Sequence, residues 1–125
     1  MSGCKTTETA VALPANYQIT VGRGGGITGM YNYYTFKQSG DVMQSEELNT
    51  KGEKLKSVEA SVVEGFMKTA IKNQYKELDL NDPGNFSNYL QVQTGNEKKL
   101  FVWNNGTTIP EWLEKLHSEM WSMAE

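Results

Sequence analysis

A cluster of glycines between two strand-like segments constrains the fold of this chain more than any other feature. It consists of Gly22, Gly24, Gly25, Gly26 and Gly29. Before it, Tyr17, Ile19 and Val21 alternate with polar residues, which predicts a strand from Asn16 to Arg23 with one buried face. After it, the aromatic and β-branched residues of Met30 to Lys37 predict a second strand. We therefore expect the glycines to form a tight, bulged or closely packed turn between antiparallel neighbours.

A third strand is predicted from Val42 to Leu48, because Ser39-Gly40-Asp41 before it has turn chemistry. The following stretch, which contains Glu46-Glu47 and several lysines, is most simply a solvated connection.

The period then changes to that of a helix. Apolar residues recur at three- and four-residue spacing and predict an amphipathic helix from Ser57 to Glu77. Gly65 inside it suggests a close approach of the helix to a neighbour. The turn sequence Asp82-Pro83-Gly84-Asn85 must end any helix before it.

The last third of the chain predicts a hairpin and a helix. Tyr89 to Thr94 and Lys99 to Asn104 have strand composition and flank a turn at Gly95. A terminal helix is expected from Pro110 to Met123, with one broad apolar face.

Together these elements predict an α+β fold with the order β-β-(β)-α-β-β-α. Short turns favour a mostly antiparallel sheet of about four to five strands with both helices on one face, a two-layer sandwich. Residues 16–125 are expected to form this single domain. On the second strand, Tyr31 and Tyr33 share one face and Tyr34 and Phe36 the other.

Composition excludes several classes of function. A net charge of -3 argues against nucleic-acid binding, and no apolar run is long enough for a membrane span. One cysteine and one histidine leave no set of metal ligands, so neither a metal nor a cofactor is expected. His117 is expected to be half-buried or on the surface, and Trp121 to be the most exposed tryptophan.

The glycines also match a dinucleotide-binding pattern, Gly24-x-Gly26-x-x-Gly29. That motif needs a helix whose first amides face the phosphate, whereas a strand is predicted after Gly29. Nucleotide binding is therefore not expected, and nothing in the sequence indicates an enzyme.

The first residues, MSGCKTTETAVALPA, have neither a helical nor a strand period, so residues 1–15 are predicted to be a flexible linker. Small residues before Cys4 resemble the processing site of a bacterial lipoprotein, which implies a lipid on Cys4 and a place in the bacterial cell envelope. The alternative is a cytoplasmic protein with an incidental cysteine.

The run from Tyr17 to Gly29, with its Gly-Gly-Gly-Ile-Thr-Gly hairpin, resembles the opening of emfourin-type proteins. The hairpin ending in Val102-Trp103-Asn104-Asn105 and the helix from Pro110 to Trp121 are similar in order. Emfourins inhibit thermolysin-like metalloproteases, so the resemblance implies a protein partner, such as a protease.

The leading hypothesis is a non-catalytic binding domain of an envelope lipoprotein. A glycine hairpin can enter a cleft without side-chain obstruction, and aromatics add contact area at little entropic cost. The expected partner-binding residues are Gly24, Gly25, Gly26, Ile27, Thr28, Tyr31 and Tyr33. The alternative is a small-molecule carrier or sensor with a pocket between sheet and helices, lined by aromatics and methionines.

Overall fold

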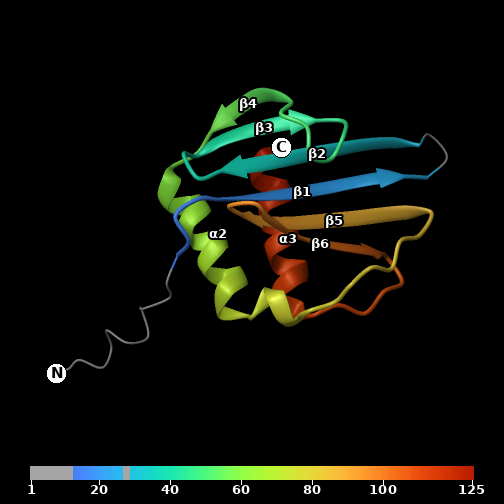
Figure 1. Ribbon diagram of the computed structural model, residues 1–125. Helices are drawn as coiled ribbons and strands as arrows, with labels where there is room; N and C mark the ends of the chain where they lie inside the picture. The colour runs from blue at the N-terminus through green and yellow to red at the C-terminus, as the bar shows by residue number, and fades with distance from the viewer. Residues whose placement is uncertain (1–12, 27–28) are drawn as a thin grey trace.

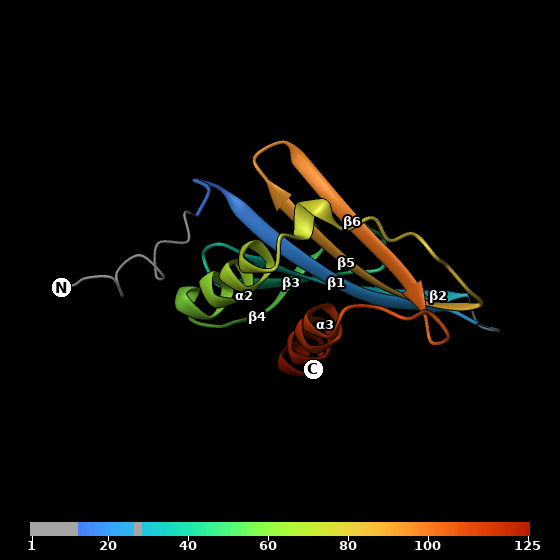
Figure 2. The same cartoon turned by 90° about the horizontal axis from the view of Figure 1, so that it is seen from below.

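In the computed structural model, a six-stranded antiparallel sheet has the order β4-β3-β2-β1-β5-β6 (Figure 1). The structure describes residues 13–26 and 29–125. Both α-helices lie on the same side of the sheet (Figure 2). The predicted α+β class is confirmed. The predicted strand number and element order are wrong, because the described residues form four strands before the first α-helix, not two or three.

The centre of the sheet follows the prediction from the glycine cluster. Strand β1 (Tyr17–Gly25) pairs antiparallel with β2 (Met30–Lys37), from Gln18 opposite Lys37 to Gly25 opposite Met30. On its other side β1 pairs with β5 (Phe86–Thr94). Strand β6 (Glu97–Asn104) then pairs with β5, which confirms the second hairpin.

The sequence pattern did not predict the strand at one edge of the sheet. Strand β3 (Asp41–Ser45) stops before the predicted Leu48, because the Ser45 hydroxyl accepts a hydrogen bond from the Glu47 N–H at 2.9 Å and starts a turn. The segment expected to be a solvated connection contains β4 (Glu53–Ser57), which pairs with β3. Its mostly exposed residues gave no hydrophobic signal, although charged side chains are common on edge strands.

The first helix is shorter than predicted. Helix α2 (Ala60–Lys72) begins after Ser57 has paired in the sheet, and it ends before Gln74, which has a left-handed φ of 56°. The chain then forms the 3-10 helix η1 (Tyr75–Glu77), which buries Tyr75. The expected close approach at Gly65 is wrong, because an added Cβ there would meet nothing within 4 Å. Helix α3 (Glu111–Ala124) matches its prediction to within one residue at each end.

The core lies between the helices and the sheet face that they cover. Strand residues such as Ile19, Phe36 and Leu90 meet Met67 of α2 and Leu113 of α3 in one cluster, and all five are fully buried. Each such side chain contributes about 1.5–3 kcal/mol of transfer free energy. The opposite face of the sheet carries no helix (Figure 2), and Gly24, Tyr31 and Tyr33 of the expected partner-binding residues lie on it.

Candidate functional site

Three tyrosines form a cluster on the helix-free face of the sheet. The rings of Tyr31 and Tyr33 on β2 are stacked, with centroids 6.4 Å apart and planes at 5°. The ring of Tyr89 on β5 meets both edge-on, at 6.2 Å from Tyr31 and 5.5 Å from Tyr33. The prediction that Tyr31 and Tyr33 share a face is confirmed. Tyr34, on the opposite face, lies in the core.

Two glycines of β1 make room for this cluster. Gly22 lies opposite Tyr33 on one side and Tyr89 on the other. A Cβ on Gly22 would lie 2.6 Å from Cε1 of Tyr33, and one on Gly24 would lie 2.8 Å from Cα of Tyr31. Both distances are too short for any side chain, so the rings pack directly against the backbone of β1. These glycines therefore serve close packing, one of the roles expected from the sequence.

The tyrosines differ in exposure, and this decides which of them a partner could touch directly. Tyr31 is 40% exposed, whereas Tyr33 is only 7% exposed and supports Tyr31 from the side. Burial, together with the neighbouring Tyr89 and Tyr31, raises the pKa of Tyr33 to about 12. Burial also raises the pKa of Tyr89. Tyr31 is thus the accessible member of the cluster, and Tyr33 supports it from within the sheet face.

At the turn end of the β1–β2 hairpin, the glycine backbone has conformations that other residues rarely adopt. Gly25 and Gly26 have φ of 109° and 76°, and the N–H of Gly26 donates to the carbonyl of Asn85. Met30 and Phe86 flank Gly25 in the register and are 68% and 41% exposed. This end of the sheet therefore combines partly exposed glycine backbone with exposed apolar side chains. Ile27 and Thr28 lie outside the described residues, as does Cys4.

The rest of the helix-free face is polar and partly covered. Thr20 and Thr35 hydrogen-bond to each other at 2.8 Å. The connection between β3 and β4 reaches across the face, where the Gln91 amide donates to Asn49 at 2.8 Å. Gln91 is consequently buried. The aromatic surface that a partner can reach on this face therefore lies at the hairpin end, in the tyrosine cluster.

Tyr89 was missed as a member of the cluster. Its sequence position, in a predicted strand far from the glycines, carries no local signal for this contact. Only the pairing of β1 with β5 brings it beside Gly22. A sequence signal does exist in retrospect, since glycines inside a strand mark places where neighbouring side chains approach the backbone.

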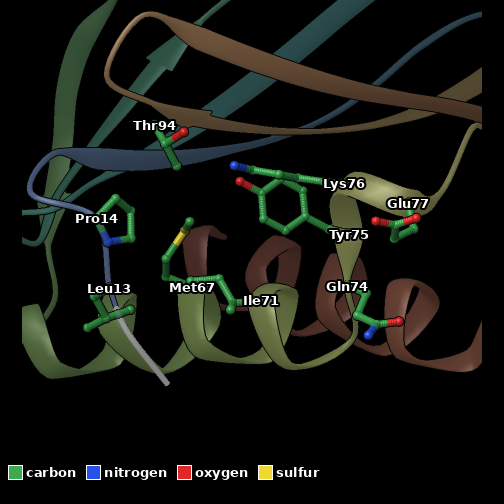
Figure 3. Close-up of a pocket in the computed structure, with 9 residues that line it drawn as sticks. All are labelled: Leu13, Pro14, Met67, Ile71, Gln74, Tyr75, Lys76, Glu77 and Thr94. Atoms are coloured by element: carbon green, nitrogen blue, oxygen red, sulfur yellow. The ribbon is translucent and has the colours of Figure 1, made fainter. Parts of the chain in front are cut away.

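A separate pocket of about 470 Å³ lies between α2, η1 and the end of β5 (Figure 3). Met67 and Ile71 come from α2 and Tyr75 from η1, while Leu13 and Pro14 close one side. Its accessible surface is mainly apolar, with Gln74, Lys76, Glu77 and Thr94 around it. Its lining contains one methionine, Met67, and one aromatic residue, Tyr75.

His117 is buried, which corrects the expectation of a half-buried or surface histidine. It is 4% exposed, and its Nε2 lies 3.1 Å from the carbonyl oxygen of Gly22. Burial, with a smaller effect of the nearby positive charge of Arg23, lowers its pKa to about 4, although the hydrogen bond to the Gly22 carbonyl acts in the opposite direction. The ring packs against Trp103 at 5.1 Å and Trp121 at 6.2 Å. Trp121 is itself only partly exposed, beneath the Arg23 guanidinium.

In the described ranges, no group of three histidine, cysteine or acidic side chains is placed to hold a metal ion. Within the same ranges, no helix has the length and hydropathy to cross a membrane. No model of a known protein family matches the chain, and no curated protein matches it significantly.

Proposed function

We propose that this chain is a non-catalytic protein-binding domain whose contact surface is Tyr31 and the adjoining end of the β1–β2 hairpin. The observation that carries the proposal is the exposed ring of Tyr31, stacked on Tyr33 and laid over Gly24. A ring held on two sides has little freedom to lose when a partner binds it. Preorganised aromatic residues of this kind are frequent hot spots of protein interfaces.

The hairpin end supplies the second part of the surface. Its exposed apolar residues Met30 and Phe86 flank the glycine backbone at Gly25. Apolar side chains around accessible main chain suit insertion into a cleft of a folded partner. This arrangement supports contact with a partner protein more directly than it supports catalysis.

We further propose a thermolysin-like metalloprotease as the partner class, in keeping with the emfourin-like sequence from Tyr17 to Gly29. The same proposal places the domain in the bacterial cell envelope, attached by lipid on Cys4. Mass spectrometry of the protein from its native membrane tests the anchor. A free Cys4 thiol behind an unprocessed Met1 would refute it.

The binding proposal is tested by titrating a thermolysin-like protease with the full chain. We expect stoichiometric inhibition, and Tyr31→Ala should weaken it at least about tenfold, the loss typical of a hot-spot aromatic. Leu55→Ala is the matched control, because Leu55 is 43% exposed but lies on the edge strand β4. Undiminished cleavage at large molar excess would exclude inhibition.

The broader binding role needs its own measurement. Immobilised wild-type protein, Tyr31→Ala and Leu55→Ala are compared for the proteins they retain from an envelope extract. A partner retained by wild type and Leu55→Ala, but lost with Tyr31→Ala, supports the proposed surface. Equal retention by all three variants would place the contact elsewhere.

The pocket in Figure 3 favours a second candidate function, a small-molecule carrier or sensor. Its volume and apolar lining suit a small apolar ligand. A ligand at about 100 times its Kd would stabilise the domain by about 2.7 kcal/mol, so a thermal-shift screen detects it. Ile71→Glu, which places a charge in the lining, should abolish the shift. A shift that survives this substitution would rule out the pocket as its source.

A further inference from the structure

A second, polar pocket lies on the helix-covered side of the sheet, away from the tyrosine cluster. It has a volume of about 550 Å³ and opens between the ends of β1, β5 and β6 and the first turns of α3. Arg23 lies at its β1 side and Asn88 at its β5 side, with Glu114, His117 and Ser118 from α3. Side chains that can hydrogen-bond dominate its surface, in contrast to the apolar pocket beside α2.

Arg23 is the unusual residue of this pocket. Its Nε is buried, and no described residue accepts a hydrogen bond from it. No carboxylate of residues 13–26 or 29–125 forms an ion pair with its guanidinium. Buried donors are normally satisfied. Arg23 as a whole is partly buried, and its buried Nε lacks the acceptor that this position calls for.

The surroundings hold the Arg23 guanidinium in place. Its Cζ lies 4.6 Å from the centre of the Trp121 ring, a cation–π contact that restrains the charged group. It also projects from β1, which pairs with a strand on each side. The planar donor group is thus positioned before any ligand arrives, a condition that favours bidentate recognition of a carboxylate.

The other ionisable groups of the pocket limit the charge of a suitable ligand. His117 is neutral at physiological pH, because burial lowers its pKa to about 4, and its Nε2 contacts the Gly22 carbonyl. Glu114 adds one negative charge to the lining. Arg23 and Glu114 together leave no excess positive charge, so a multiply charged anion such as phosphate is disfavoured relative to a single carboxylate.

We propose that this pocket binds a monocarboxylate, which pairs with the guanidinium of Arg23. The carboxylate belongs either to a free organic acid or to the C-terminus of a peptide, since the chemistry presented to Arg23 is the same. The site lies on the opposite face of the sheet from Tyr31 but shares Phe86 with the proposed protein-binding surface, so Arg23→Gln and Tyr31→Ala test the two proposals separately.

Nuclear magnetic resonance of the ¹⁵N-labelled full chain tests the proposal. Sodium acetate and trialanine with a free C-terminus are titrated separately, with sodium chloride at equal ionic strength and trialanine amide as controls. We expect saturable shifts of the Arg23 Nε–H and His117 signals with at least one carboxylate and none with either control. Acetate binding supports a free acid, whereas binding of trialanine alone supports a peptide terminus.

Substitution identifies the residue responsible. Arg23→Gln should weaken binding at least about tenfold, the scale of one charged hydrogen bond. Lys98→Gln, which removes an exposed cation from β6, should leave it unchanged. The proposal is overturned if neither carboxylate binds, if the amide binds equally, if phosphate binds more tightly than both carboxylates, or if a folded Arg23→Gln protein retains full affinity. If Arg23→Gln does not fold, the wild-type titrations against the controls decide alone.

Discussion

Acidification should destabilise this protein through His117. The imidazole is 4% exposed and lies between Trp103 and Trp121, with Arg23 close by. Protonation would place a second positive charge in this buried site. The folded protein therefore resists protonation, and the pKa of His117 falls to about 4.

The size of the effect follows from proton linkage. A histidine in the unfolded chain has a pKa of about 6.5, so the unfolded state binds the proton first as the pH falls. Stability due to neutral His117 is complete above pH of about 6.5 and is lost between there and the folded pKa. The loss is about 2 kcal/mol by pH of about 5 and about 3 kcal/mol by pH of about 4.

Urea denaturation at several pH values, followed by tryptophan fluorescence, measures this loss. The control is His117→Gln, whose amide can still donate to the Gly22 carbonyl but does not titrate. Its free energy of unfolding should be lower than that of wild type at neutral pH but should change much less between pH of about 6.5 and 4. Asp41, whose pKa is lowered by hydrogen bonds from Lys54 and Ser57, titrates in both proteins and cancels. Equal pH dependence in the two proteins would refute the assignment to His117.

Four further predictions concern packing and ionisation. Gly24→Ala should lower the free energy of unfolding by about 1–3 kcal/mol in urea denaturation, because its Cβ would overlap Tyr31. Gly65→Ala should raise it by about 0.5–1 kcal/mol, since helix α2 leaves open space there; a loss would contradict this account. Leu113→Ala should cost about 2–5 kcal/mol, because the side chain is fully buried, and a smaller loss would mean that the cavity collapses. Ultraviolet titration should find Tyr33 ionising near pH of about 12, and Tyr33→Phe should remove that late step. Because the pKa of Tyr33 is raised in the folded protein, the stability that protonated Tyr33 contributes should fall as the pH rises above about 10.

Local patterns predicted the elements whose structure depends on neighbouring residues in the chain. Alternating polarity predicted β1, and the aromatic run of residues 30–37 predicted β2 with the bounds that the structure has. Turn chemistry predicted the β5–β6 hairpin at Gly95, which has a φ of 60°. The three- and four-residue period predicted both helices. These signals suffice because turns and amphipathic faces are set by residues close together in sequence.

Elements that depend on distant partners were missed or misjudged. Strand β4 has little apolar signal and exists through its pairing with β3. The predicted helix continued through Gln74, but the chain turns there to bury Tyr75. Propensity is a weak guide in such places, since burial elsewhere in the fold outweighs it.

The sequence by itself determined the α+β class, the glycine hairpin and the common face of Tyr31 and Tyr33. Tertiary structure decided which of these tyrosines is exposed, and it alone placed Tyr89 beside them. It also brought Arg23 of β1 to α3, where His117 contacts a backbone carbonyl 95 positions away in the chain. The physical reason is that periodicity fixes the face on which a side chain lies, whereas sheet order and helix packing fix what it meets there.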